Sequence, residues 1–268
     1  MLRSMSELEG YAIQATDGPI GHVKDFYFDD KSWVVRYLIV DTGSWLSSRQ
    51  VLISPMSVEP SIWDENVLNV SITREQVSNS PDIDTDKPVS RQHEMEYLGY
   101  YGYPYYWGGG GMWGTGGYPG MMLPGSAYAG TYAEDAQRHD DPHLRSCNAV
   151  KGYHIHATDG EIGHVQGYLV DERSWAIQYL VIDTSNWWLG HQVLVAPQWA
   201  LQVSWTDSKV SIDLDRKAIQ GAPVYDPTVS LSRDAELGLH RHYGRTGYWR
   251  GEDQAARAGE PVAAGIAD

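Results

Sequence analysis

The sequence contains a single cysteine, Cys147, and only two phenylalanines among its 268 residues. One cysteine excludes an intramolecular disulfide and a cysteine-rich zinc site, and it favours a reducing compartment. No apolar run approaches the roughly 18 to 20 residues that cross a bilayer. Glu7 also lies where a signal peptide would begin its apolar segment. We therefore expect a cytoplasmic protein that does not insert into membranes.

Basic residues are scarce as well. Lys and Arg number 20 against 35 Asp and Glu, which gives a formal net charge of −15 at pH 7. This charge repels phosphate backbones, so we expect no binding to nucleic acid. The aromatic residues are mostly Tyr (18) and Trp (11), whose rings carry a polar group and suit partly hydrated interfaces.

Common catalytic motifs are missing. The sequence has no Gly-x-Ser-x-Gly nucleophile elbow and no Gly-x-x-x-x-Gly-Lys-Ser/Thr phosphate loop. The matched carboxylates Asp17/Asp159 and Asp41/Asp183 could perform acid–base chemistry if the fold brought them together. Asp in Asp-Gly turns and at strand ends is, however, ordinary turn chemistry. We expect no catalytic residues, no enzymatic activity and no cofactor.

The chain carries one pattern twice. Gly10 aligns with Gly152, an offset of 142 positions, and the register then holds without a gap. Aligned pairs include Trp33 with Trp175, Pro55 with Pro197, Pro81 with Pro223 and, in an appended tail, Tyr106-Trp107 with Tyr248-Trp249. A gap-free match of this length indicates a duplicated domain.

Alternating apolar residues and turn residues predict short strands in the first unit. Their ranges are 10–15, 20–29, 33–41, 50–54, 57–63 and 67–72. One helical turn capped by Thr73 should follow, and a short tail helix should begin after Ser90 and end near Gly99 or Gly102. Because barrel closure removes exposed strand edges, short strands with tight turns favour small barrels. The predicted fold class is all-β: two small β-barrels in tandem, each with a short helical tail.

Composition predicts four segments. The first barrel unit with its tail spans 1–107, and the second spans 148–250. Between them, 108–147 begins rich in Gly, Tyr and Trp and lacks any usable period, so we expect a flexible linker. The Ala/Gly/Glu-rich segment 251–268 is expected to be disordered.

The repeated stretch Asp-Gly-x-x-Gly-x-Val predicts a tight hairpin, since Gly adopts the positive φ that such turns need. The hairpin residues are Asp17, Gly18 and Gly21 in the first unit and Asp159, Gly160 and Gly163 in the second. Together with the strands Tyr37-Leu38-Ile39-Val40 and Tyr179-Leu180-Val181-Ile182, this stretch resembles the PRC-barrel family, which includes the cytoplasmic domain of the photosynthetic reaction centre H subunit and the C-terminal domain of the ribosome maturation factor. The resemblance covers about 10–81 and 152–223, and it implies a tandem bacterial member with a small β-barrel fold that contacts other proteins.

Two groups of side chains are candidates for binding. The predicted interaction surface consists of aromatic residues in matched loops and tails: Trp45, Trp187, Trp188, Tyr106, Trp107, Tyr248 and Trp249. Exposed Trp suggests a contact surface, but the loop Trp could equally fold over the barrel mouth, and the tails could lie across their own barrels.

The second group is confined to the second unit. His154 and His156 are two apart on a predicted strand and face one side, a spacing that can hold a metal; His240 and His242 follow in the tail. Solvent-facing polar residues on an edge strand are the alternative. The paired His22 and His164 are either paired ligands or pH-responsive groups, or they are hairpin residues bonded to the neighbouring turn.

The function expected from these features is that of a non-catalytic protein-interaction or assembly module, with its two barrels packed as a pseudo-dimer. Its partner would be an unidentified protein or a second copy. One alternative is a metal- or small-ligand-binding module that uses the second-unit histidines. Another, from the family resemblance alone, is a role in photosynthetic electron-transfer assemblies.

Overall fold

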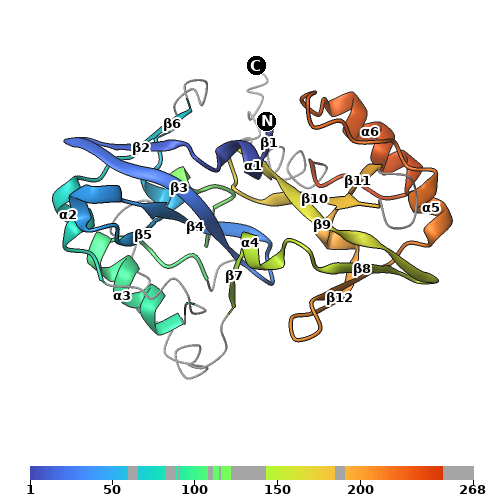
Figure 1. The fold of residues 1–268 in the computed structure, drawn as a ribbon, viewed down its shortest axis with the longest axis horizontal. Helices are drawn as coiled ribbons and strands as arrows, with labels where there is room; N and C mark the ends of the chain where they lie inside the picture. Colours follow the sequence, from blue (N-terminus) through green and yellow to red (C-terminus); the bar gives the residue numbers. More distant parts are fainter. Residues whose placement is uncertain are drawn as a thin grey trace, which may run out of the picture.

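The computed structural model describes residues 1–59, 66–81, 89, 91–107, 111–114, 116–121, 143–184 and 191–249, with the backbone alone at 91, 92 and 121. It is mostly β, with two sheets side by side and a few short helices (Figure 1).

The first sheet has the strand order β5-β4-β3-β2-β6. Its strands are β2 (Ala12–Ala15), β3 (Gly18–Asp29), β4 (Val34–Asp41), β5 (Gln50–Ile53) and β6 (Val67–Asn69). Two helices follow, α2 (Arg74–Ser78) and α3 (Arg91–Tyr101), and the 3-10 turns η1 (Gly43–Leu46) and η2 (Pro55–Ser57) flank β5. Most of β4 is buried, as its nearly continuous apolar sequence predicts.

The second sheet has the order β11-β10-β9-β8-β13-β12. Its strands are β8 (His154–Ala157), β9 (Gly160–Asp171), β10 (Ile177–Asp183), β11 (Gln192–Val195), β12 (Ala200–Ser204) and β13 (Lys209–Ile212). The turn η5 (Pro197–Trp199) and the helices α5 (Arg216–Gln220) and α6 (Arg233–His242) complete this half. In both sheets the first hairpin strand pairs in parallel with a late strand, β2 with β6 and β8 with β13.

Sequence reasoning predicted closed barrels, and the described residues do not show closure. Each sheet ends at two strands that do not pair with each other, β5 and β6 in one and β11 and β12 in the other. The edge of β5 is covered by helix α3 instead. There the Tyr97 hydroxyl donates to the Leu52 carbonyl at 2.9 Å and accepts from the Ser54 N–H at 3.2 Å. A side chain thus satisfies backbone groups that barrel closure would otherwise pair.

Each sheet is extended by a short arm from the other half of the chain. The arms are β1 (Leu2–Ser4) with α1 (Met5–Leu8), and β7 (Leu144–Ser146) with α4 (Cys147–Val150). Strand β1 pairs with β9 of the second sheet, and β7 pairs with β3 of the first. Figure 1 shows both arms at the centre, where the two sheets meet.

Of the range predicted to be a flexible linker, 108–147, the structure describes 111–114, 116–121 and 143–147, and these parts contain packed structure. It includes β7, the first residue of α4 and the turn η3 (Pro119–Met121). Trp113, also in this range, is fully buried. The lack of a sequence period in this range therefore did not mean a lack of fixed contacts. The segment 251–268, predicted to be disordered, lies outside the described residues.

Within the described ranges, no helix is both long enough and apolar enough to cross a membrane.

Candidate functional site

The repeated hairpin is fixed by its own aspartates and glycines. Asp17 accepts a hydrogen bond from the Arg74 N–H at 2.7 Å, and Asp159 accepts the matching bond from Arg216 at 2.8 Å. The two Asp side chains therefore tie each hairpin to the first residue of a short helix. Gly18 and Gly160 both have φ of +147°, where L side chains are strained.

The second glycine of each hairpin lies against the neighbouring strand. A Cβ at Gly21 would be 1.9 Å from the Asp41 carbonyl oxygen, and a Cβ at Gly163 would be 2.0 Å from that of Asp183. Only glycine permits this approach. Together with the Asp contacts, this gives the hairpin a structural role.

The aromatic residues of the predicted interaction surface largely contact their own halves. Trp45 donates through Nε1 to the Ile20 carbonyl, and the Arg74 guanidinium lies 4.3 Å from the centre of its ring. Tyr106 is buried, while Trp107 stacks on Tyr105 at 4.7 Å. The loop residues Trp187 and Trp188 lie outside the described residues.

In the second tail, Tyr248 donates to Glu236 at 2.9 Å, and Trp249 lies 4.9 Å from the His240 ring. The contacts described for both tails are thus made within their own halves, and those of Tyr248 and Trp249 are to helix α6.

The structure separates the four candidate metal ligands. His154 pairs with Glu161 at 2.8 Å on the exposed β8–β9 hairpin, and His156 is 3.9 Å from the same carboxylate. His240 is buried beside Tyr179, whereas the His242 Nε2 hydrogen-bonds the Ala218 carbonyl at 2.7 Å. Across the described ranges, no three or more His, Cys, Asp or Glu side chains are arranged to hold a metal ion.

The remaining paired candidates are His22 with His164 and Asp41 with Asp183. The His164 Nε2 lies 4.0 Å from Asp183, and its counterpart His22 is exposed. Asp41 accepts the Gly43 N–H at 2.9 Å within its own turn. The Asp41 contact matches the turn chemistry expected of aspartate, whereas His164 and Asp183 are opposite each other on β9 and β10.

A buried polar cluster lies between β4 and helix α3 in the first half. The Glu94 side chain is fully buried and accepts from Tyr37 at 3.2 Å and from Tyr106. His143 Nε2 lies 2.6 Å from the same carboxylate. Arg36 stacks on the Tyr106 ring at 3.8 Å. A buried carboxylate needs such partners to offset its desolvation, and Tyr37, Tyr106 and His143 supply them to Glu94 from three parts of the chain.

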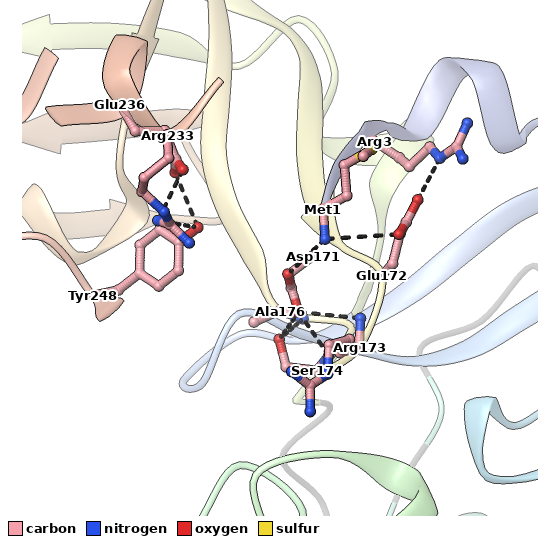
Figure 2. Close-up of polar contacts among 10 residues, drawn as sticks. All are labelled: Met1, Arg3, Asp171, Glu172, Arg173, Ser174, Ala176, Arg233, Glu236 and Tyr248. Carbon is pink, nitrogen blue, oxygen red and sulfur yellow. Dashed lines mark hydrogen bonds and ion pairs between the residues drawn. The ribbon is translucent and has the colours of Figure 1, made fainter. Parts of the chain in front are cut away.

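The second half has a related cluster around Glu236, 142 positions on. Glu236 accepts from Tyr179 at 3.1 Å. It also accepts from Tyr248 at 2.9 Å, and Arg233 lies 2.9 Å away, as Figure 2 shows for these three residues. Burial raises the pKa of Glu236, while its hydrogen bonds act in the opposite direction. In this half the cation is Arg233 of helix α6. The strand residue that aligns with Arg36 is the uncharged Gln178.

The two arms make matching contacts. Leu2 is opposite Asp171 and Ser4 is opposite Leu169, while Leu144 is opposite Asp29 and Ser146 is opposite Tyr27. Each pairing becomes the other when 142 is added or subtracted. The contact between the halves is therefore a reciprocal strand exchange with approximate two-fold symmetry.

Charged side chains follow the same symmetry. Arg3 donates to Glu172 at 2.6 Å, as Figure 2 shows, and its counterpart Arg145 donates to Asp30 at 3.0 Å. Glu9 and Lys151 are themselves aligned positions, and they form an ion pair at 2.6 Å. Because the two positions are equivalent in the repeat, two identical halves would carry the same charge at both and would repel each other there. The ion pair thus requires that the two halves differ in sequence.

The backbone is strained at the centre of the junction. Trp33 and Trp175 have φ of 55° and 59°, values that are unusual for bulky residues. The Trp175 carbonyl accepts from the Val35 N–H at 2.8 Å, and the Trp33 carbonyl accepts from Ile177 at 2.7 Å. Contact with the opposite half thus stabilises a conformation that costs about 1 kcal/mol or more by itself.

Sequence reasoning missed the arms, the Glu94 and Glu236 clusters and the buried Trp113. A signal for the arms exists: Leu2-Arg3-Ser4 recurs as Leu144-Arg145-Ser146 at the same offset as the rest of the repeat. For the clusters, the signal is an aligned Glu together with two aligned Tyr positions. A repeat that keeps a carboxylate and its hydroxyl donors in register is typical of a buried hydrogen-bonded group.

The strand order and the glycine-fixed hairpin define the first half as a small β-sheet module with a hydrogen-bonded carboxylate in its interior. Residues 2–74 match the family model of the PRC-barrel domain. The chain thus carries a PRC-barrel domain in its first half. A search of curated proteins found no match.

Proposed function

We propose that the chain is a non-catalytic interaction and assembly module, in which two PRC-type units are packed as a pseudo-dimer. The reciprocal strand exchange is the main support for this function, because each sheet contains a strand from the other half. The second unit lies beyond the matched range of the family model, and its PRC-type assignment rests on its strand order and its repeated hairpin.

An exchanged pair of units suits a scaffold. Since the arms contribute buried side chains such as Met5, Leu8, Leu144 and Val150, separating the halves would expose them. In this proposal a partner meets one body with two related faces, which the exchanged strands hold together.

The ionisable side chains of the interior support a non-catalytic role. The carboxylates of Glu94 and Glu236 are engaged by Tyr, His and Arg partners. Burial also raises the pKa of the Cys147 thiol well above its usual value, which disfavours the reactive thiolate. These groups stabilise the packing rather than face a substrate.

The proposal is tested by isolating the protein from its native source under mild conditions. Light scattering after size-exclusion chromatography gives the mass of the complex, and mass spectrometry identifies what accompanies the chain. We expect a defined complex larger than the 30.0 kDa chain, with one protein partner or a second copy in fixed ratio. A lone chain with no companion, or turnover in a broad esterase and phosphatase screen, would contradict the proposal.

The alternative, a metal- or ligand-binding module, has less support because the four histidines lie apart. Its remaining candidates are His154 and His156, which flank Glu161 on one exposed hairpin. Calorimetric titration with zinc, nickel and copper tests it, with the His154→Ala/His156→Ala variant as control. Equal and negligible heats for both proteins would exclude this function.

A further inference from the structure

A tryptophan from the segment between the halves fills a site in the first half. Trp113 is fully buried, and its indole N–H donates to the Ser174 carbonyl of the opposite half at 2.7 Å. Its ring lies 4.6 Å from the Arg36 guanidinium and 6.1 Å from the Tyr106 ring. The site therefore combines a carbonyl acceptor, a cation and an aromatic ring, all of which suit an indole.

A glycine-rich turn presents this tryptophan. The Gly114 N–H donates to the Tyr106 carbonyl at 2.8 Å, and Trp113 and Gly116 form a small bridge. A Cβ at Gly111 would be 2.4 Å from the Gly116 oxygen, so the turn needs glycine there.

The symmetry of the junction implies a second site of the same kind. Ser32 corresponds to Ser174, Tyr248 to Tyr106 and Gln178 to Arg36, each at the offset of 142. Because the strand exchange and the Trp33 and Trp175 contacts follow the same offset, we expect Ser32 to face the second half as Ser174 faces the first.

The second site differs in what covers it. Ser174, beneath Trp113, is 4% exposed, whereas Ser32 is exposed and Tyr248 is only half-buried. In the sequence, Trp113 aligns with Ala255, and 250–268 contains no aromatic residue. The chain thus offers no tryptophan at this position of its second repeat.

The polar groups of this second site remain suited to an indole. Arg233 lies over the Tyr248 ring at 5.3 Å (Figure 2) and over the chain's own Trp249 ring at 4.5 Å, with half of its side chain exposed, so a cation adjoins aromatic rings here too. Gln178 is 1% exposed, and neither its amide nitrogen nor its oxygen has a hydrogen-bond partner among the described residues. Such a group usually has a partner in the functional state.

We propose that the site formed by Ser32, Gln178, Arg233 and Tyr248 receives a tryptophan, carried on a glycine-rich turn of a partner protein. The inference rests on the proposed interaction function and identifies one recognition feature of the partner. Trp113 is the internal template: its indole shows the donor and ring positions that the incoming side chain would adopt. Buried Trp is also among the residues that most often dominate interfaces.

The probe for this site is a peptide with the sequence of residues 110–118, Gly-Gly-Met-Trp-Gly-Thr-Gly-Gly-Tyr. Titrated into the isotope-labelled full chain, it should give saturable amide shifts around Ser32 and Tyr248 with a stoichiometry of one. A peptide with Ala in place of Trp should bind about tenfold more weakly or worse. No saturable shift with the Trp peptide up to millimolar concentration would overturn the proposal.

Protein variants locate the binding. Tyr248→Ala should abolish it, while Tyr248→Phe keeps the ring and should retain it. Trp113→Ala opens the first site and should raise the stoichiometry to two. Binding that appears only after removal of 250–268 would mean that the chain's own end occupies the site, which overturns a partner as occupant. A protein that still co-purifies with the chain when the peptide fails would leave the assembly function standing and refute this inference alone.

Discussion

Replacing Leu144 by Ala should destabilise the first sheet, although Leu144 belongs to the second repeat in sequence. Leu144 begins the second repeat but is 1% exposed within the first sheet, opposite Asp29 on β3. Removing a buried leucine side chain to Ala costs about 2–5 kcal/mol. We expect the larger loss of hydrogen-exchange protection on β3 rather than on β9, together with a lower urea midpoint.

The reciprocal variant provides the comparison. Leu2→Ala removes the matching contact on the other side and should reduce protection mainly on β9, near Leu169 and Asp171. Leu201→Ala, at a position 65% exposed, should change neither strand. If Leu144→Ala reduced hydrogen-exchange protection mainly on β9, and Leu2→Ala reduced it mainly on β3, the strand exchange would be refuted.

Three further predictions concern the hairpin, the junction and one buried acid. Gly21→Ala should lower the free energy of unfolding by about 1–3 kcal/mol or more, because its Cβ would be 1.9 Å from the Asp41 oxygen. Glu9→Lys should destabilise by about 0.5–1 kcal/mol through repulsion of Lys151, and exchanging the two residues should restore stability. Burial raises the pKa of Asp25 despite hydrogen bonds from Ser146 and the backbone. We therefore compare the free energy of unfolding of Asp25→Asn with that of the wild type. The difference, variant minus wild type, should rise with pH between about pH 4, the ordinary pKa of Asp, and the raised pKa of Asp25 in the folded state.

Each of these predictions has an outcome that contradicts it. For the hairpin, Gly99→Ala is the matched control, because nothing lies within 4 Å of a Cβ there; an equal loss in both variants would remove the steric argument. If the charge-exchanged variant is no more stable than Glu9→Lys, the ion pair does not act at the junction. The folded state binds the Asp25 proton more tightly than the unfolded state does. The protonated side chain therefore stabilises the fold most at low pH, and this stabilisation is lost as pH rises. A stability difference independent of pH would contradict the raised pKa.

Local patterns allowed much of each sheet to be predicted. The hairpin, the long buried strand β4 and the helical turn after Thr73 follow from turn residues, apolar period and capping. The cap at Thr73 was found as expected: its hydroxyl accepts from the Gln76 N–H at 3.1 Å, and the Gln76 side chain accepts in return from the Thr73 N–H at 2.8 Å. These features depend on neighbours in sequence, which a single sequence contains.

The junction and the Trp113 site could not be derived in the same way. Strands as short as β1 and β7 are too brief to show a period of two, and their partners lie far away along the chain. Trp113 lies in a glycine-rich stretch whose composition is typical of a linker. Its burial depends on contacts with Arg36, Tyr106 and Ser174, which are far from one another in the sequence. Closed barrels were predicted from the general need to cover strand edges, whereas here Tyr97 and α3 cover one of them.

The most direct test of the two-unit body is to cut the chain between its halves. A specific protease site introduced between residues 122 and 142 lets the two fragments be released from each other under native conditions. The reciprocal strand exchange predicts that they stay together on size-exclusion chromatography, with light scattering still giving about the 30.0 kDa of the intact chain. Elution as two separate folded fragments would contradict the account.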